Sequence, residues 1–159
     1  MGLRTLITAG STREPIDPVR FIGNRSSGRM GASLAEAAMR LRHAVTLILG
    51  TTYVQMPSDA RRIDVETTAQ MHEAVLREFS ACDLLIMAAA PADFRPVRVS
   101  PAKIARQDRL IIECEPTEDI IAAAGRLKRP DQRTVAFSLE SSPDFDRVRG
   151  KMRCKCVDL

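Results

Sequence analysis

The stretch Gly10–Gly31, GSTREPIDPVRFIGNRSSGRMG, lies between a short apolar segment that ends at Ala9 and a helical pattern that begins near Gly28. In an open parallel sheet, ligands bind outside the carboxyl ends of the strands, where the first turn of a helix also presents free N–H groups. The stretch carries four arginines, four hydroxyl side chains and four glycines. It therefore predicts an anion-binding loop, although it has neither the spacing of a Walker P-loop nor a GxGxxG motif.

The segments around this loop alternate between strand and helix patterns. Short apolar or β-branched runs predict strands at Leu3–Ala9, Ala44–Leu49, Arg61–Val65, Leu84–Ala90, Arg109–Cys114 and Thr134–Ser138. Helical spacing predicts helices near 28–42, 69–80 and 143–155, and another after Thr117. Leu84–Ala90 is the most apolar run and is expected to be a central strand, and Val157–Leu159 has the pattern of a strand's first residues. This order predicts an α/β fold, a three-layer α/β/α sandwich with a Rossmann-like, mainly parallel sheet.

Local signals predict the ends and the buried faces of these helices. Ser26 or Ser27 is available to cap the first helix, and Thr117 can cap the helix that follows it. Met30 and Met39 are expected in the core. The apolar residues that recur at helical spacing in the first helix are Met30, Leu34, Ala37, Ala38 and Leu41.

The composition favours one soluble domain. The 159 residues suffice for a single core, and the net charge of +4 comes mostly from arginines spread along the chain. Aromatic residues make up 4% with no Trp, so a base-stacking nucleic-acid surface is not expected. The four cysteines show neither C-x-x-C pairs nor histidines at zinc spacing, which favours reduced thiols. No apolar run has the length of a membrane span, so we expect a cytoplasmic protein without a membrane partner.

Several polar residues in the loops are candidates for chemistry. Asp93 follows an apolar run, where its carboxylate could accept ribose hydrogen bonds, lie near a metal, or simply form an Asx turn. Lys103 could reach a transferring phosphoryl group or be a solvated loop lysine. Asn24 can donate and accept hydrogen bonds at once, whereas Asp17 before Pro18 is typical of a turn. No Ser-His-Asp order and no HExxH motif supports a hydrolase.

Six motifs resemble one known family in the same order along the chain. TAGSTREPIDPVRFIGNRSSGRMG is similar to the opening signature of the phosphopantothenoylcysteine synthetases, the ligases of coenzyme A biosynthesis that are fused in many bacteria to a flavin-dependent decarboxylase. AAAPADFRP resembles the family's AAAVADYRP, and PAKIAR falls at its lysine-rich segment. EPTEDII, VAFSLES and KMRCKCVDL resemble the family's remaining motifs. The resemblance therefore covers essentially the whole chain.

The resemblance implies a two-step ligation. The carboxylate of 4'-phosphopantothenate attacks the α-phosphate of CTP with Mg²⁺ as cofactor, and the amine of cysteine then displaces CMP from the acyl-cytidylate. Asn24 and Lys103 match the family's catalytic residues, and Arg20, Asn24 and Arg25 are expected to bind the substrate. The residues expected to bind the nucleotide are Gly10, Ser11, Thr12, Ser26, Ser27, Gly28, Ala90, Asp93 and Phe137. No residue is assigned to a metal.

The same resemblance carries expectations about assembly and length. Family members are dimers in which the segment matching Val97–Glu113 helps to build the interface, so a homodimer is expected. The family continues beyond its KxxDL motif, so residues 1–159 are expected to be one synthetase-like domain that is truncated at its C-terminus, with a decarboxylase as a possible separate partner. Two alternatives remain: a non-catalytic module that binds phosphopantothenate or nucleotide, and a dinucleotide oxidoreductase, which the absent GxGxxG disfavours.

Overall fold

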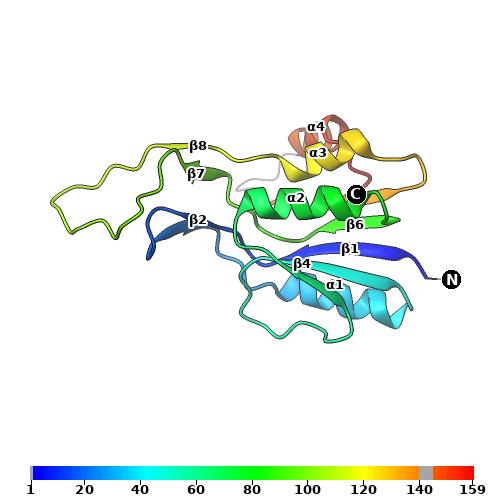
Figure 1. Ribbon diagram of the computed structural model, residues 1–159. Coiled ribbons are helices and arrows are strands. Elements are labelled where there is room, and N and C mark those ends of the chain that lie inside the picture. Colours follow the sequence, from blue (N-terminus) through cyan, green and yellow to red (C-terminus); the bar gives the residue numbers. More distant parts are fainter. Residues whose placement is uncertain (1, 140–144) are drawn as a thin grey trace.

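A five-stranded parallel sheet forms the centre of the computed structural model, which describes residues 2–139 and 145–159 (Figure 1). Its strands are β1 (Arg4–Ala9), β4 (Ala44–Leu49), β5 (Arg61–Asp64), β6 (Leu84–Met87) and β9 (Arg133–Ala136). They lie in the order β5-β4-β1-β6-β9, and every neighbouring pair is parallel. The chain therefore builds outward from β1 in both directions, which creates a topological switch point between β1 and β6. The predicted Rossmann-like fold is confirmed.

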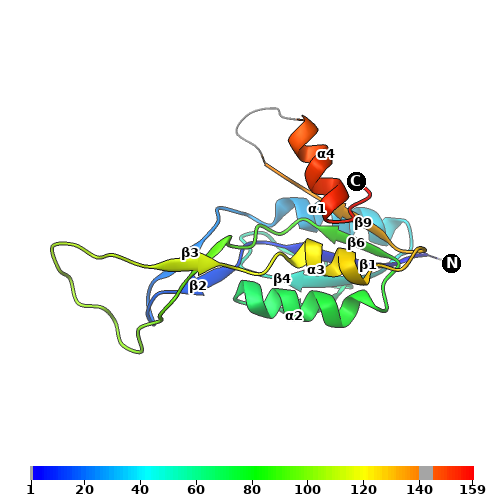
Figure 2. The ribbon, with the colours of Figure 1, turned by 90° about the horizontal axis from the view of Figure 1, so that it is seen from above.

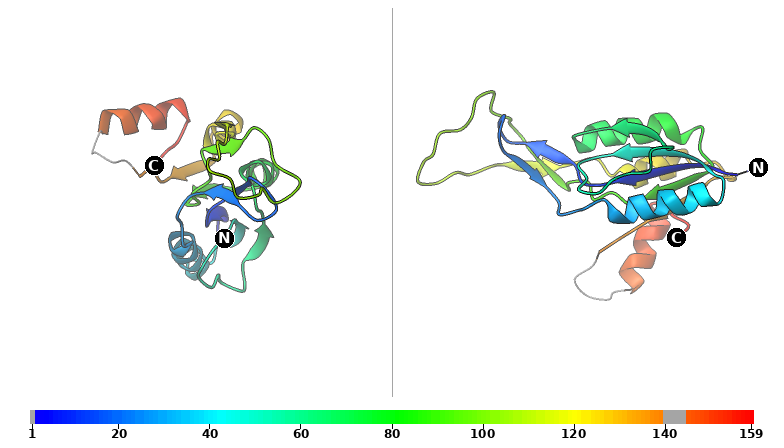
Figure 3. Two further views of the ribbon diagram at one scale, coloured as in Figure 1. Left: turned by 90° about the vertical axis from the view of Figure 1, so that its left-hand side faces the viewer. Right: turned by 90° about the horizontal axis from the view of Figure 1, so that it is seen from below.

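Helices cover both faces of this sheet. Helix α1 (Arg29–Arg40) packs on one face, and α2 (Thr68–Phe79) and α3 (Ile120–Leu127) pack on the other (Figures 1 and 3). Leu6 and Ile7 of β1 point to opposite sides, and each is buried in a different cluster of apolar side chains. Helix α4 (Phe145–Cys154) lies beyond β9 and has no buried residue (Figure 2). Both faces of the sheet are thus sealed, which explains the continuous apolar runs in its strands.

Two short ribbons extend the structure past the carboxyl ends of the sheet strands. Strand β2 (Arg13–Pro15) pairs antiparallel with β3 (Phe21–Gly23), and β7 (Phe94–Pro96) pairs antiparallel with β8 (Cys114–Pro116). Residues 97–113, here called the arm, connect β7 to β8 without regular structure and project away from the sheet (Figures 1 and 2). Neither ribbon was predicted, and the strand expected at Arg109–Cys114 was wrong because strand pairing begins only at Cys114. Three-residue strands give too little alternation to detect.

The first helix differs from its prediction at its start and on its packed face. Gly28 is the N-cap residue, with φ of 82°, and no side chain caps the helix, so the predicted capping by Ser26 or Ser27 was wrong. The face toward the sheet consists of small residues, and Met30 is 53% exposed, which contradicts its predicted core position. Met39 is partly buried against the core. The buried residues of α1 are Gly31, Ala32, Ala35 and Ala38.

The remaining elements follow the predictions with smaller differences. The predicted helix at 69–80 is confirmed as α2, with Thr67 and Gln70 forming a capping box. Asp119, rather than Thr117, caps α3, because the Thr117 hydroxyl donates to the carbonyl of Ala92. The central strand expected at Leu84–Ala90 is confirmed as β6, which pairs with β1 on one side and β9 on the other but ends at Met87. Backbone hydrogen bonds join Leu159 to Thr134 and Ala136, so the last residues lie along β9 as a strand would. The start of the predicted helix at 143–155 lies outside the described residues, and α4 confirms the rest.

Close packing of α1 on β1 makes Gly31 sensitive to substitution. A Cβ at Gly31 would lie 2.3 Å from the Cβ of Ala9 and 3.1 Å from its Cα. We predict that Gly31→Ala lowers the free energy of unfolding by about 2 kcal/mol, because overpacking outweighs the better helix propensity of alanine. Urea denaturation measures this change. Ser33→Ala, at an exposed position of the same helix, is the matched control and should leave stability unchanged or slightly higher. Equal stability of Gly31→Ala and the wild type would contradict the packing described.

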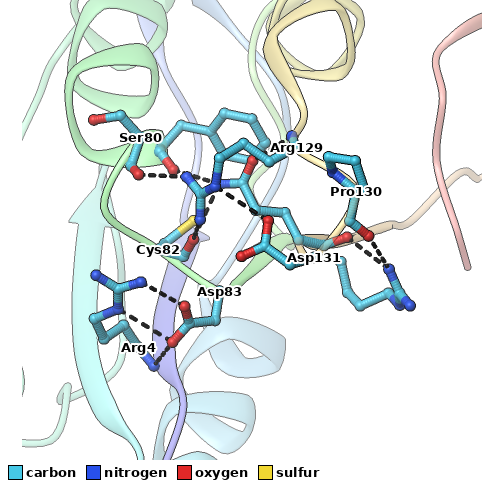
Figure 4. Close-up of polar contacts among 10 residues, drawn as sticks. Arg4, Ser80, Cys82, Asp83, Arg129, Pro130 and Asp131 are labelled. Carbon is cyan, nitrogen blue, oxygen red and sulfur yellow. Dashed lines mark hydrogen bonds and ion pairs between the residues drawn. The ribbon is translucent and has the colours of Figure 1, made fainter.

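An ion pair joins the amino ends of β1 and β6 (Figure 4). The backbone N–H of Arg4 donates to Asp83 Oδ2 at 2.8 Å, and its guanidinium donates to both carboxylate oxygens. Side-chain and backbone hydrogen bonds from Arg4 lower the pKa of Asp83 to about 2.

Nearby, Arg129 donates to the carbonyls of Ser80 and Cys82, and these two hydrogen bonds hold the turn that follows α2. Burial raises the pKa of the Cys82 thiol to about 11, so this thiol stays protonated at neutral pH.

The lowered pKa of Asp83 links stability to acid pH. The folded carboxyl has a pKa of about 2 against 3.8 for the ordinary group, so the ion pair stabilises the fold above pH 3.8 and loses this effect as pH falls toward 2. We therefore predict that Asp83→Asn is less stable than the wild type at pH 7 and that the difference shrinks between pH 4 and pH 2. Denaturant melts at several pH values measure it. Asp108→Asn, which alters an exposed arm carboxyl, is the control, and a pH-independent difference for Asp83→Asn would contradict the prediction.

Candidate functional site

The loops after β1 and β6 meet at the switch point of the sheet. The N–H of Ala90 donates to the carbonyl of Gly10 at 2.8 Å, and the backbones of Ser11 and Thr51 exchange two hydrogen bonds at 2.8 and 3.0 Å. Gly10 has φ of 80°, and a Cβ there would lie 2.4 Å from the Thr51 carbonyl oxygen, so only glycine fits. The ends of β4, β1 and β6 are therefore fastened to one another at the edge where ligands bind in such folds.

Buried hydroxyls hold these loops in place from beneath. Thr12 Oγ1 accepts a hydrogen bond from Ala92 N at 2.8 Å and shares another with Thr68 Oγ1 at 2.8 Å. Thr117 Oγ1 donates to the carbonyl of Ala92 at 2.6 Å, and Thr68 N donates to Glu14 Oε1 at 2.7 Å. Thr12 is fully buried. The structure thus places Thr12, a predicted nucleotide contact, in the scaffold beneath the site.

Asn24 connects the β2–β3 ribbon to the loop after β6. Its Nδ2 donates to the carbonyl of Pro91 at 2.7 Å, although the two residues are far apart in sequence. Within the described residues, no donor contacts its Oδ1, so this oxygen can accept a hydrogen bond from a ligand. Asn24 also lines two separate cavities. It is therefore the point at which two bound molecules could meet.

The larger cavity, of about 740 Å³, lies at the carboxyl ends of β6 and β9 and at the start of α3. It brings together four predicted site residues, namely Asn24, Ala90, Asp93 and Phe137. The Asp93 carboxylate has no hydrogen-bond or ion-pair partner among the described residues, so the predicted Asx turn is not formed by them. Lys155 also lines the cavity and pairs with Asp119 at 2.8 Å. The lining mixes apolar residues with polar and charged ones such as Thr117 and Glu118, and such a mixture can hold the base and the ribose of a nucleoside.

The smaller cavity, of about 500 Å³, lies on the other side of Asn24. Its lining contains two arginines and no acidic residue, so it carries positive charge. The Arg13 guanidinium lies 4.3 Å from the centre of the Phe21 ring and donates to Tyr53 Oη at 3.4 Å, which fixes its position. The cavity is lined by Ser11, Arg13, Phe21, Gly23, Asn24, Arg25, Ser26, Ser27 and Tyr53. The cavity ends next to the first turn of α1. Hydroxyl groups, guanidinium groups and the N-terminus of a helix therefore lie close together, and each of these can bind an anion.

Five predicted site residues line neither cavity, namely Gly10, Thr12, Gly28, Arg20 and Lys103, and the last two are associated with the arm. Arg20 pairs with Asp17 at 3.0 Å and donates to the carbonyl of Ile104 at 3.1 Å, so its guanidinium contacts the arm. Lys103 is exposed on the arm and lines neither cavity. Sequence reasoning included Arg13 in the anion-binding stretch without assigning it a role, and it missed Tyr53. The signal was present, because both follow strands that end at the same edge of the sheet, β1 and β4.

The part of the chain that the structure describes holds neither a preformed metal cluster nor a membrane-spanning helix. Residues 2–139 and 145–159 contain no group of three or more His, Cys, Asp or Glu side chains that could hold a metal ion. No helix within these residues is both long and apolar enough to span a bilayer. A divalent cation at this site would thus need a ligand to supply most of its oxygen atoms.

The sequence and the fold of this chain are similar to those of known proteins. Residues 1–159 match the family described as the DNA/pantothenate metabolism flavoprotein C-terminal domain. The crystal structure of the C-terminal domain of a coenzyme A biosynthesis bifunctional protein CoaBC has a TM-score of 0.87 and 38% sequence identity, and the match covers 99% of this chain and 75% of that chain.

Two curated relatives match over a comparable length. The CoaBC protein of Vibrio cholerae is 41% identical over 162 residues, which cover 100% of this chain and 41% of the relative. A cysteine/cysteine sulfinic acid decarboxylase from an unknown prokaryotic organism is 45% identical over 160 residues, which cover 99% of this chain and 45% of the relative. The chain thus spans less than half the length of these two relatives. The agreement over the whole chain, together with the fold, shows that it belongs to the DNA/pantothenate metabolism flavoprotein C-terminal domain family.

Proposed function

We propose that this chain is a ligase domain of coenzyme A biosynthesis that joins 4'-phosphopantothenate to cysteine through an acyl-cytidylate. The observation that carries the proposal is the pair of cavities that share Asn24, one cationic and one suited to a nucleoside. The relatives named as coenzyme A biosynthesis proteins support it. A single site must bring a carboxylate to a nucleotide α-phosphate, and two adjoining cavities supply that arrangement.

In this proposal the nucleoside occupies the larger cavity and its phosphates extend past Asn24 toward Ser26, Ser27 and Gly28. The phosphopantothenate carboxylate attacks the α-phosphorus, and the bond to pyrophosphate breaks. The cysteine amine then attacks the acyl carbon, CMP leaves, and the amine loses a proton. Asn24 is suited to orient the acyl intermediate, because Nδ2 is fixed on Pro91 while Oδ1 remains an acceptor. Arg13 and Arg25 supply positive charge for the phosphate groups.

Magnesium is part of the proposal as a partner of the phosphates. Mg²⁺ in such sites is bound by one or two carboxylates together with phosphate oxygens and water. The unpaired Asp93 carboxylate lines the larger cavity, where the nucleoside is proposed to bind, so phosphate oxygens and water would supply most ligands of the ion. When bound, the ion would neutralise charge on the triphosphate. The rest of the positioning falls to Asn24 and the hydroxyls of the smaller cavity.

The arm is proposed to act in a homodimer. Lys103 lines neither cavity of its own chain, and the arm projects from the body (Figures 1 and 2). The arm and the strands beside it expose large apolar side chains, including Val97, Val99 and Ile111. Association of two arms would cover these side chains and could bring Lys103 to the site of the second copy. A cation that arrives in this way could stabilise charge developing at the α-phosphate.

Incubation with CTP, Mg²⁺, 4'-phosphopantothenate and cysteine tests the proposed activity. We expect release of pyrophosphate and formation of phosphopantothenoylcysteine, and accumulation of acyl-cytidylate when cysteine is left out. ATP in place of CTP tests the choice of nucleotide. Binding of both substrates without pyrophosphate release would favour a non-catalytic module. Release of CO₂ from cysteine or cysteine sulfinic acid alone would instead favour a decarboxylase, the activity named for one relative.

Two variants test whether one site combines residues of two chains. We predict that Lys103→Gln and Asn24→Ala each lower the rate of product formation at least 100-fold while the far-ultraviolet circular dichroism spectrum stays native. Mixing and re-associating equal amounts of the two variants should restore up to about a quarter of the wild-type rate, because about half of the dimers are then mixed and each of these holds one site with both native residues. Each variant incubated alone is the control. Loss of activity without any recovery on mixing would place both residues in the site of one chain.

A further inference from the structure

A buried carboxylate links the turn between β2 and β3 to the arm. The Asp17 side chain is fully buried and accepts four hydrogen bonds. Its Oδ1 accepts from the backbone N–H groups of Val19 and Arg20, each at 2.8 Å. Its Oδ2 accepts from Ile104 N at 3.1 Å and from Arg20 Nη1 at 3.0 Å. One carboxylate therefore holds its own turn and the arm at the same time.

Arg20 also binds the backbone of Ile104. Its Nη2 donates to the carbonyl of Ile104 at 3.1 Å. Both backbone polar groups of Ile104 are thus bonded to the Asp17–Arg20 ion pair. A second tie lies close by, where Ser100 N donates to the carbonyl of Ile16 at 2.9 Å. Lys103 lies between these two fixed points and directly precedes Ile104.

The rest of the arm offers few contacts that could fix Lys103. Residues 97–113 contain no helix or strand. The hydrogen bonds that the arm makes to itself include Val97 N to Glu113 O at 3.0 Å, at its base, and Ser100 Oγ to Ala102 O at 2.6 Å. A segment of this kind samples many backbone conformations unless tertiary contacts restrain it. The ion pair at Ile104 supplies such a restraint next to the lysine.

The surroundings of Asp17 favour the ionised form of its carboxyl group. Burial alone would raise the pKa of Asp17, but hydrogen bonds from the backbones of Val19, Ile104 and Arg20 and the charge of Arg20 lower it overall. A carboxylate accepts hydrogen bonds and donates none, so it matches four donors without conflict. An asparagine in its place would point an NH₂ group at one pair of these donors.

We infer that the Asp17–Arg20 ion pair is a positioning device that sets the place of Lys103 through the backbone of Ile104. The inference rests on the proposed function, in which Lys103 assists nucleotidyl transfer. It changes the role expected for Arg20, which acts on the arm and through it on the lysine, whereas the sequence resemblance implies substrate binding. Misplacing a group at the reacting centre by about 1 Å can lower a rate by two orders of magnitude. Asp17 and Arg20 would thus affect the chemical step without contacting the substrates.

A double-mutant cycle on the full chain tests this inference. Single-turnover transfer from radiolabelled CTP is measured for the wild type, Asp17→Asn, Lys103→Gln and the double variant. We expect Asp17→Asn to lower the rate about tenfold in the wild-type background and less than twofold in the Lys103→Gln background. The KM for CTP should change less than threefold. Asp64→Asn, which alters an exposed surface ion pair, is the matched control and should keep the wild-type rate.

Arg20→Gln provides the second variant, which keeps the test decisive should Asp17→Asn fold poorly. Arg20→Gln should lower the single-turnover rate about tenfold in the wild-type background and less than twofold in the Lys103→Gln background. The KM for 4'-phosphopantothenate should not rise. A raised KM with unchanged single-turnover rate would show substrate binding and overturn the inference. An equal loss in both backgrounds would also overturn it, because the ion pair would then act elsewhere.

Hydrogen exchange separates this inference from the proposed function. In Asp17→Asn and Arg20→Gln, the amide of Ile104 should exchange at least tenfold faster than in the wild type, while amides of β1 and β6 keep their protection. Unchanged exchange at Ile104 would contradict the positioning role whatever the enzyme activity. Faster exchange together with full activity of Lys103→Gln would instead show that the arm is held as described and that the proposed role of Lys103 is wrong.

Discussion

The hydrogen bond from Ala90 N to Gly10 O fastens the carboxyl ends of two neighbouring parallel strands at the point where the strand order reverses. Beyond this contact, the segments that leave β1 and β6 stay joined by the hydrogen bond from Ala92 N to Thr12 Oγ1, and each runs into a short antiparallel ribbon. Gly10 makes this possible because its positive φ turns the backbone where a side chain would collide with Thr51. The two ribbons, the arm and both cavities all lie beyond this one contact.

The polar residues of the site fall into two groups. Some hold the loops in place, and others present free atoms to a ligand. Thr12 has its hydroxyl hydrogen-bonded in the scaffold, and Arg20 is engaged by Asp17 and Ile104. Asn24 and Asp93 present oxygen atoms without partners among the described residues. Groups whose hydrogen bonds are already made contribute rigidity, and rigidity of the supporting residues is what keeps a catalytic geometry accurate.

The sequence predicted the main sheet well because its strands are buried on both faces. Ala44–Leu49 matches β4 residue for residue, and the helix expected near 69–80 is α2. The face of α1 could not be predicted from hydrophobicity, because the sheet approaches so closely that Gly31 and Ala35 are packed while Met30 is exposed. The residues of α1 that pack on the sheet are those small enough to fit there, and a hydrophobicity pattern contains no information on side-chain fit.

The site was predictable in part for a related reason. Ala90 and Asp93, which follow β6, line one cavity because the carboxyl ends of parallel strands share an edge. Arg13, Arg20 and Arg25 could not be distinguished in the sequence. Their roles depend on long-range contacts, with Tyr53 for Arg13 and with Ile104 for Arg20. Such contacts leave no local signal in a single sequence.

The central claim is that two reactants meet at Asn24 from two adjoining cavities. A crystal structure of the protein with CTP, Mg²⁺ and 4'-phosphopantothenate tests it most directly. We expect the cytosine and ribose beside Ala90, Asp93 and Phe137, the phosphate groups against Ser26 and Ser27, and the α-phosphorus within reach of the Asn24 side chain. Nucleotide bound elsewhere, such as between α4 and Lys128, with both cavities empty of ligand, would contradict it.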